Sequence, residues 1–94
     1  MATVYVLRSE DKDSYYIGSC KDLGIRLEEH NNKQFENSYT TKAEDWVVVF
    51  RIDDLTFGQA RSIESHIKKM KSRKYIENLI QFPEISLRLK KRYQ

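Results

Sequence analysis

The 94-residue sequence has only one cysteine, one proline and three glycines, and it lacks a long apolar run. Because Cys20 has no second cysteine to pair with, an internal disulfide is excluded, which fits a reducing compartment. No stretch approaches the roughly 18 apolar residues that span a bilayer, and no signal-peptide pattern opens the chain. An apolar content of 39% supports a modest core and excludes a disordered chain. We therefore expect a cytoplasmic protein of one small domain, with no membrane partner.

Positive charge is scarce in the first half of the chain and abundant in the second. Residues 1–46 contain 6 Lys or Arg and 9 Asp or Glu, whereas residues 47–94 contain 11 and 5. The two halves therefore carry net charges of −3 and +6. Such a field suits a phosphate backbone or another acidic partner, and the plain alternative is a solvated, lysine-rich helix surface.

The first 20 residues predict a β-hairpin that carries a tyrosine in each strand. Residues 3–7 and 15–18 have the composition of short strands, and the polar residues 8–14 between them predict a solvated loop. If the strands pair antiparallel, Tyr5 and Tyr16 project from the same face of the sheet. Packing alone also explains two strand aromatics, so the tyrosines indicate a site only if other residues converge on them.

A helix and a third strand are predicted next. Asp22 is a good N-cap for a helix that begins at Leu23 and fades at residues 30–32. Residues 33–45 are polar and aperiodic, which predicts a long loop. Residues 46–52 form the most β-prone run, and their near-continuous apolar character predicts a strand covered on both faces for much of its length. Together these elements predict an α+β fold in which helices flank a small three-stranded antiparallel sheet.

The remaining residues predict a long helix, a short helix and a basic tail. The long helix begins near Phe57 with Thr56 or Asp54 as cap, and its predicted buried stripe comprises Ala60, Ile63, Ile67 and Met70. The short helix spans residues 75–80 and is expected to turn Ile76, Leu79 and Ile80 inward. We assign residues 1–82 to the domain and residues 83–94 to a basic tail whose structure the sequence leaves open. The cations expected at the C-terminal end of the long helix are Lys68, Lys69, Lys71, Arg73 and Lys74.

Three further residues suit phosphate chemistry, and each has a plain alternative. Glu64 is the only acidic residue of the long helix and suits Mg²⁺ or Mn²⁺, but it also suits an ion pair with Lys68 four residues on. Arg26 suits bidentate phosphate binding or an ion pair with nearby acidic residues. His30, four residues after Arg26, suits proton transfer, phosphate binding or capping of the helix end.

Taken together, these residues resemble the GIY-YIG endonuclease family. Residues 3–5, Thr-Val-Tyr, stand where the family has Gly-Ile-Tyr, and residues 16–18 are an intact Tyr-Ile-Gly after a ten-residue spacer. The family's helical Arg and the frequent following His fall at Arg26 and His30, and its metal-binding Glu falls at Glu64. The resemblance covers residues 3–80 and is closest to small single-domain members, similar to the nuclease domain of the excision-repair incision subunit and of homing endonucleases.

The resemblance implies Mg²⁺- or Mn²⁺-dependent hydrolysis of DNA phosphodiester bonds, in DNA repair or recombination. It implies a catalytic set of Tyr5, Tyr16, Arg26, His30 and Glu64, with one divalent ion on Glu64. Asn78 and Tyr39 are further candidates, and the five helical cations named above are expected to hold the DNA backbone. Two alternatives stay open, a non-catalytic nucleic-acid-binding module and a protein-interaction domain. A core this small also makes a homodimer or a partner protein plausible.

Overall fold

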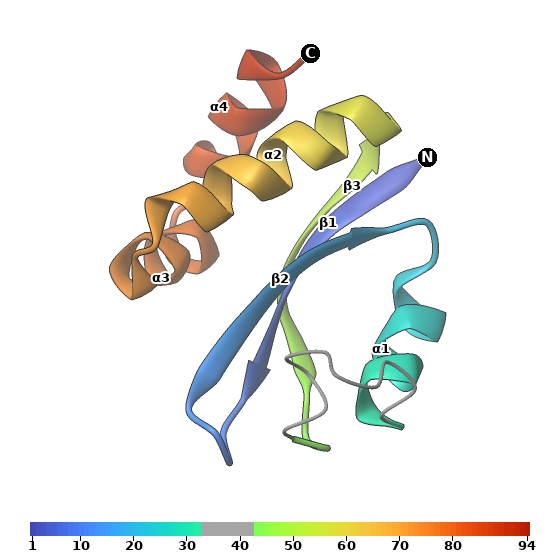
Figure 1. The fold of residues 1–94 in the computed structure, drawn as a ribbon. Coiled ribbons are helices and arrows are strands. Elements are labelled where there is room, and N and C mark those ends of the chain that lie inside the picture. The colour runs from blue at the N-terminus through green and yellow to red at the C-terminus, as the bar shows by residue number, and fades with distance from the viewer. Residues whose placement is uncertain (33–42) are drawn as a thin grey trace.

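The computed structural model describes residues 1–32 and 43–94, which form three strands and four helices (Figure 1). The strands are β1 (Ala2–Ser9), β2 (Ser14–Cys20) and β3 (Val47–Leu55), and they form an antiparallel sheet of order β2-β1-β3. The helices are α1 (Leu23–Asn31), α2 (Phe57–Met70), α3 (Arg73–Gln81) and α4 (Pro83–Arg92). The predicted α+β class and three-stranded sheet are confirmed.

The sheet is sandwiched between α1 on one face and α2, α3 and α4 on the other (Figure 1). Successive residues of β1 alternate between the two faces, as a pleated strand requires. Val4 and Val6 join the core beneath α2, whereas Tyr5 and Leu7 join the cluster beneath α1. Within the described residues, no helix is long and apolar enough to span a bilayer.

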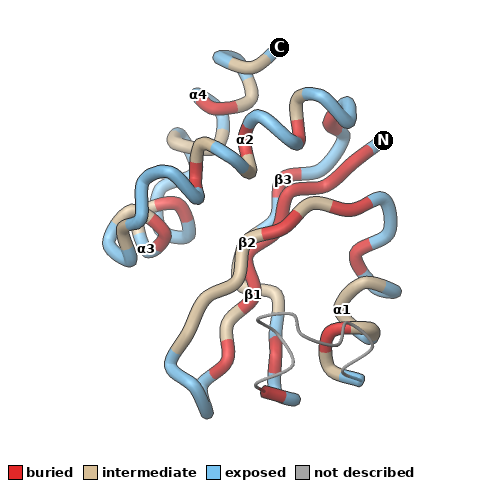
Figure 2. The backbone as a smooth tube through the Cα atoms, viewed as in Figure 1, coloured by how far each residue is buried: buried red, intermediate tan, exposed pale blue. Residues whose placement is uncertain are grey.

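The strand covered on both faces is β1, so the prediction that gave this role to residues 46–52 is wrong. The central β1 is buried along nearly its whole length, whereas β3 lies at an edge and leaves Val47 55% exposed (Figure 2). Which strand lies at the centre of the sheet depends on how the three strands pair. The apolar composition of β3 does not reveal that pairing. The strand also continues beyond residue 52, because the fully buried Leu55 pairs with Ala2.

The hairpin is longer than predicted, and the loop expected at residues 8–14 is wrong. Arg8 pairs with Tyr15 and Ser9 with Ser14, which leaves only residues 10–13 in the turn. The Arg8 guanidinium lies 5.0 Å from the centroid of the Tyr15 ring and donates a hydrogen bond to the Asp13 carboxylate. These contacts between polar side chains stabilise the last residue pairs of the hairpin.

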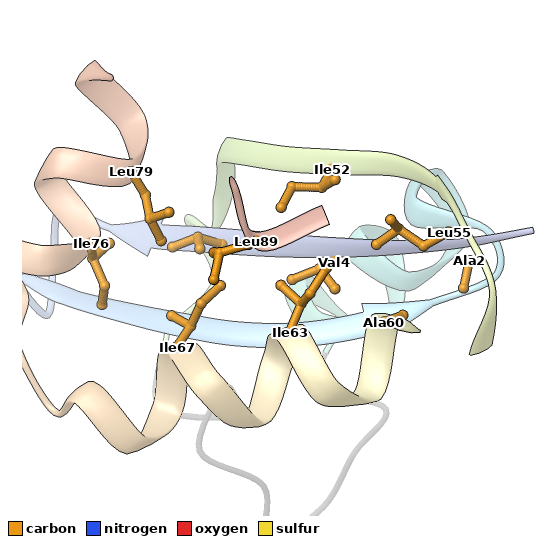
Figure 3. Packing of buried hydrophobic residues seen from close by; sticks show 11 residues of the cluster. Ala2, Val4, Ile52, Leu55, Ala60, Ile63, Ile67, Ile76, Leu79 and Leu89 are labelled. Atoms are coloured by element: carbon orange, nitrogen blue, oxygen red, sulfur yellow. The ribbon is translucent and has the colours of Figure 1, made fainter. Parts of the chain in front are cut away.

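Side-chain caps fix where α1 and α2 begin, as predicted. The Asp22 carboxylate accepts a hydrogen bond from the Ile25 amide at 3.1 Å, and Thr56 forms a capping box with Gln59. In α2 the predicted stripe is buried at Ala60, Ile63 and Ile67 (Figure 3). Met70 is 45% exposed, so its assignment to the stripe is wrong. It ends the helix, since Lys71 adopts a left-handed conformation with φ 46°.

Helix α3 begins two residues earlier than predicted, at Arg73, with Ser72 as its N-cap. Arg73 and Lys74 therefore open α3 and do not belong to the end of α2. Ile76 and Leu79 are buried, but Ile80 is 40% exposed, so its predicted inward position is wrong because the buried face of α3 is narrow.

Residues 83–92, whose structure the sequence leaves open, form α4. Pro83 occupies the first turn, where its missing N–H costs nothing. Leu89 is 4% exposed and packs in the same core as the buried residues of α2 and α3 (Figure 3). Gln59 of α2 donates a hydrogen bond to the Lys90 carbonyl oxygen at 2.9 Å, which further anchors α4.

Candidate functional site

Tyr5 and Tyr16 lie on the sheet face that α1 covers. In the β1–β2 ladder Tyr5 is opposite Gly18 and Leu7 is opposite Tyr16, so both tyrosines project from the same face, as predicted. Their ring centroids are 6.4 Å apart. Tyr5 is 1% exposed, whereas Tyr16 is partly exposed, so the pair extends from the interior towards solvent.

Gly18 makes room for the Tyr5 side chain. A Cβ atom at Gly18 would stand 2.6 Å from the Tyr5 hydroxyl oxygen, 2.7 Å from its Cζ and 3.1 Å from Cε1 of Tyr16. Gly18 is not among the site residues that we predict individually. A glycine inside a strand commonly marks a close approach of another group, which is the signal that points to it.

His30 connects α1 to the Tyr5 hydroxyl. It is 3% exposed, and its Nε2 lies 3.1 Å from the Tyr5 oxygen in a buried hydrogen bond. Its ring centroid is 5.0 Å from that of Tyr16, so the three rings form one cluster. Burial, and then the charge of Arg26, lowers the pKa of His30 below its usual value. A neutral imidazole can accept the Tyr5 proton at Nε2.

The Tyr5 phenol is held in its protonated form. Burial chiefly raises its pKa well above the usual value, and the nearby Tyr16 adds to this effect. Arg26 acts in the opposite direction, and Glu64 raises the pKa further. Both charged side chains therefore lie within electrostatic reach of the Tyr5 hydroxyl. A preformed tyrosinate is unfavourable in this environment.

Arg26 stands on α1 at the edge of the same cluster. Its side chain is 38% exposed, and its Nε lies 3.9 Å from a carboxylate oxygen of Glu29, so the plain ion-pair alternative is present at long distance. Because its charge influences both Tyr5 and His30, the guanidinium lies beside the aromatic cluster and remains partly open to solvent. This position suits binding of an anion in front of the tyrosines.

Glu64 approaches from the opposite side of the sheet. It belongs to α2, and its Oε1 accepts a 2.5 Å hydrogen bond from the Ser19 hydroxyl while Oε2 accepts one of 2.6 Å from Lys68. Ser19 directly follows Gly18 in the edge strand β2, so the Tyr5 ring and the Glu64 carboxylate contact consecutive residues from the two faces. The site therefore wraps around the edge of the sheet. Ser19 was not predicted, because no sequence motif identifies it.

Glu64 and its neighbours can bind a hard divalent cation only if water and substrate supply most of the ligands. Within the described ranges no three His, Cys, Asp or Glu side chains cluster. The carboxylate has about four lone-pair positions, of which Ser19 and Lys68 occupy two. Mg²⁺ commonly binds one or two carboxylates and completes its shell with water and substrate phosphate. Glu64 satisfies that minimal set, and the Ser19 hydroxyl orients it.

An open pocket of about 640 Å³ surrounds the Glu64 carboxylate. Cations dominate its wall, in which Glu64 is the only acidic residue among those that the structure describes. The pocket is lined by Ser19, Arg61, Glu64, Ser65, Lys68, Lys69 and Lys71. This composition suits a polyanionic ligand placed next to a single carboxylate.

The structure does not bring the five predicted DNA-binding cations together as one cluster. Lys69 and Lys71 line the Glu64 pocket, but Lys68 pairs with Glu64 itself. Arg73 bonds the Asp13 carboxylate and lies 5.3 Å from the Tyr15 ring centroid, which fastens α3 to the hairpin.

The remaining predicted cation and the two further candidates lie apart from the aromatic cluster or outside the described residues. Lys74 is exposed in the first turn of α3. Asn78 is partly buried on the same helix, on the sheet face opposite to Tyr5 and His30. Tyr39 lies outside the described residues.

Comparison with known proteins gives one match. The family model of the GIY-YIG catalytic domain matches residues 1–76, which include every strand and the tyrosine, arginine, histidine and glutamate positions described above. Neither the curated proteins nor the solved structures yielded a match. Because the match covers most of the 94 residues and the fold agrees with it, this chain belongs to the GIY-YIG nuclease superfamily.

Proposed function

We propose that the protein is a metal-dependent DNA endonuclease that hydrolyses phosphodiester bonds. The observation that supports this proposal best is the buried hydrogen bond between the Tyr5 hydroxyl and His30 Nε2, 3.1 Å long. The bond satisfies two polar groups whose burial would otherwise be costly, and it also places a neutral histidine as the acceptor of the Tyr5 proton. Their arrangement suits transfer of a proton away from a bound water molecule.

Proton transfer proceeds through Tyr5 to His30. Since the Tyr5 phenol is protonated, it accepts a proton from water only as it passes its own proton to His30 Nε2. The hydroxide formed attacks phosphorus, the bond from phosphorus to the leaving 3′ oxygen breaks, and that oxygen takes a proton from solvent. His30 ends the step as imidazolium, and it returns its proton to solvent after cleavage. Tyr16, whose ring lies beside both groups, orients the water or a phosphate oxygen.

Two charged residues bind the reacting phosphate. Arg26 neutralises the charge that builds on the non-bridging oxygens, because its guanidinium can donate two parallel N–H hydrogen bonds to them. Glu64, oriented by the Ser19 hydroxyl, would hold the divalent ion. When bound, Mg²⁺ or Mn²⁺ supplies positive charge that stabilises the phosphate and the leaving oxygen.

Nicking of supercoiled plasmid tests this function. We expect the purified protein to nick DNA in Mg²⁺ or Mn²⁺ and to lose activity in EDTA. The Glu64→Gln variant keeps the size of the side chain and one acceptor oxygen but removes its charge, so it should lose at least about 10²-fold in rate. Metal-dependent nicking at the wild-type rate by Glu64→Gln contradicts the role of Glu64.

The second candidate is a nucleic-acid-binding module without turnover, which the +6 charge of residues 47–94 favours. A panel of branched, flapped and single-stranded DNA structures separates the two functions. Binding of the panel without cleavage of any member in either metal supports the module, and cleavage of one member supports the nuclease and identifies its substrate.

A further inference from the structure

A second open pocket lies between the outer face of α2 and the end of α4. Its volume is about 460 Å³, and three cations contribute to its wall, Arg61 and Lys69 from α2 and Arg92 from α4. Serine hydroxyls of α2 and the His66 and Tyr93 side chains complete the lining, in which the described residues include no carboxylate. Cations and neutral hydrogen-bonding groups without an acid form a surface suited to an anion.

The three cations of this pocket have no carboxylate partner among the ion pairs of the described residues. Lys68 and Arg73, by contrast, are each within 2.6 Å of an acidic side chain. A cation already paired with a carboxylate must give up that contact before it binds a phosphate. Arg61, Lys69 and Arg92 therefore provide the more accessible positive charge on this side of the molecule.

The His66–Tyr93 pair joins the two helices that form the pocket. The Tyr93 hydroxyl lies 2.8 Å from His66 Nδ1, and the rings meet edge to face with centroids 5.7 Å apart. Partial burial, and then Arg92 and Lys69, lowers the pKa of His66, so both cations lie near the ring. A neutral His66 that accepts the Tyr93 proton at Nδ1 keeps an N–H donor at Nε2.

This second pocket adjoins the Glu64 pocket. Arg61, Ser65 and Lys69 line both, so a single strand of phosphates can pass from one to the other along α2. Arg92 and Tyr93 lie beyond residues 1–76, the part of the chain that matches the family. Helix α4 therefore contributes two residues to this pocket from outside the matched region.

We propose that the pocket formed by Arg61, Lys69 and Arg92 binds a backbone phosphate of the nucleic-acid strand whose neighbouring phosphate lies at Glu64. This inference rests on the proposed function, because it takes the Glu64 pocket as the place of cleavage. The contact is made to the backbone and not to the bases, so it strengthens binding without selecting a sequence.

Binding of a fluorescent oligonucleotide, measured by anisotropy over a range of salt concentrations, tests the proposal. All proteins carry Glu64→Gln and are kept in EDTA, so that cleavage plays no part. Arg61→Gln with Arg92→Gln should raise Kd at least about tenfold near 0.1 M salt. Because one phosphate contact is lost, it should also reduce the slope of log K against log salt by about 0.9 for duplex DNA or about 0.7 for a single strand. Arg61→Lys with Arg92→Lys should keep most of the affinity, since it keeps the charge.

A charge-matched control removes two cations from another part of the surface. Lys12 in the hairpin turn and Lys21 before α1 are exposed and lie outside both pockets. Lys12→Gln with Lys21→Gln lowers the net charge by the same amount and should leave Kd within about twofold. An equal loss in both double variants, or no loss in the Arg61/Arg92 variant, overturns the proposal. Melting temperatures within about 4 °C of the parent, a small shift for a domain of this size, exclude unfolding as the cause.

The same variants distinguish failure of this pocket from failure of the nuclease function. If the protein with Glu64 intact nicks plasmid and the Arg61/Arg92 variant nicks with unchanged kcat/KM, the pocket is overturned and the nuclease stands. If nothing nicks DNA but the Arg61/Arg92 variant loses affinity, the pocket stands and the nuclease is overturned.

Discussion

Gly18 lies directly opposite Tyr5 in the β1–β2 ladder, and the Tyr5 ring fills the space that a side chain at Gly18 would occupy. The closest approach, 2.6 Å from an ideal Cβ position to the Tyr5 hydroxyl oxygen, involves the atom that also bonds His30. The backbone at Gly18 thus determines where the Tyr5 hydroxyl lies. It has no positive φ, so the glycine is needed for space and not for conformation.

Gly18→Ala should impair the site more than the fold. The added methyl group displaces the Tyr5 hydroxyl relative to His30, and displacement by about 1 Å can cost about 10²-fold in rate. Overpacking should also cost about 1–3 kcal/mol of stability. Gly58→Ala is the matched control, because a Cβ added at Gly58 in α2 would meet no other atom within 4 Å and alanine is the better helix former. Equal nicking rates for the two variants contradict the role given to Gly18.

The pH dependence of nicking should report His30. Burial and Arg26 place the pKa of this imidazole below its usual value of 6.5, and only the neutral form accepts a proton from Tyr5. Log kcat/KM should therefore rise with pH and level off below pH 6.5. His30→Gln should lose about 10²–10⁴-fold in rate together with this acid limb. An unchanged acid limb in His30→Gln assigns the titration to another group.

Ser19→Ala should weaken metal activation while leaving the carboxylate in place. The Ser19 hydroxyl donates a 2.5 Å hydrogen bond to Glu64, and loss of such a supporting contact commonly costs about 10–100-fold in metal affinity or activity. The Mg²⁺ concentration for half-maximal nicking should rise, while the rate at saturating Mg²⁺ changes less. Ser19→Thr retains the hydroxyl and should stay near the parent. A loss of equal size in both variants points to packing and not to the hydrogen bond.

Asp13 should stabilise the fold at neutral pH and lose this effect in acid. Hydrogen bonds from Arg73, and then from Arg8, lower the pKa of the carboxyl from 3.8 to about 2. Because the pKa is lower in the folded state, the contribution is complete above about pH 4 and disappears as pH falls towards 2. The difference in urea midpoint between the parent and Asp13→Asn should therefore be positive at pH 7 and shrink below pH 4. Asn tolerates the positive φ of 48° at this position, so backbone strain does not obscure the comparison.

Asp11→Asn is the control for this measurement. It removes the same charge from an exposed side chain in the same turn, 3.8 Å from Lys12. The pairing of Asp13 with two arginines is contradicted if Asp11→Asn reproduces the full pH-dependent change.

The sequence by itself determined the features that local periodicity and capping control. The alternation of β1 put Tyr5 on one face and Val4 on the other, and Asp22 and Thr56 marked where two helices begin. The helical spacing of Ala60, Ile63 and Ile67 identified the buried face of α2. These features depend on dihedral geometry and on contacts within a few residues, so they can be read along the chain.

Tertiary structure decided which residues meet. Only packing places β3 at an edge, exposes Met70 and directs Arg73 to Asp13, because each depends on the relative position of segments far apart in sequence. The family resemblance named Tyr5 and Glu64 together. The structure shows how they approach one edge strand from opposite faces, with Gly18 and Ser19 as their contacts. Long-range contacts of this kind depend on chain connections and core shape, which no local sequence pattern encodes.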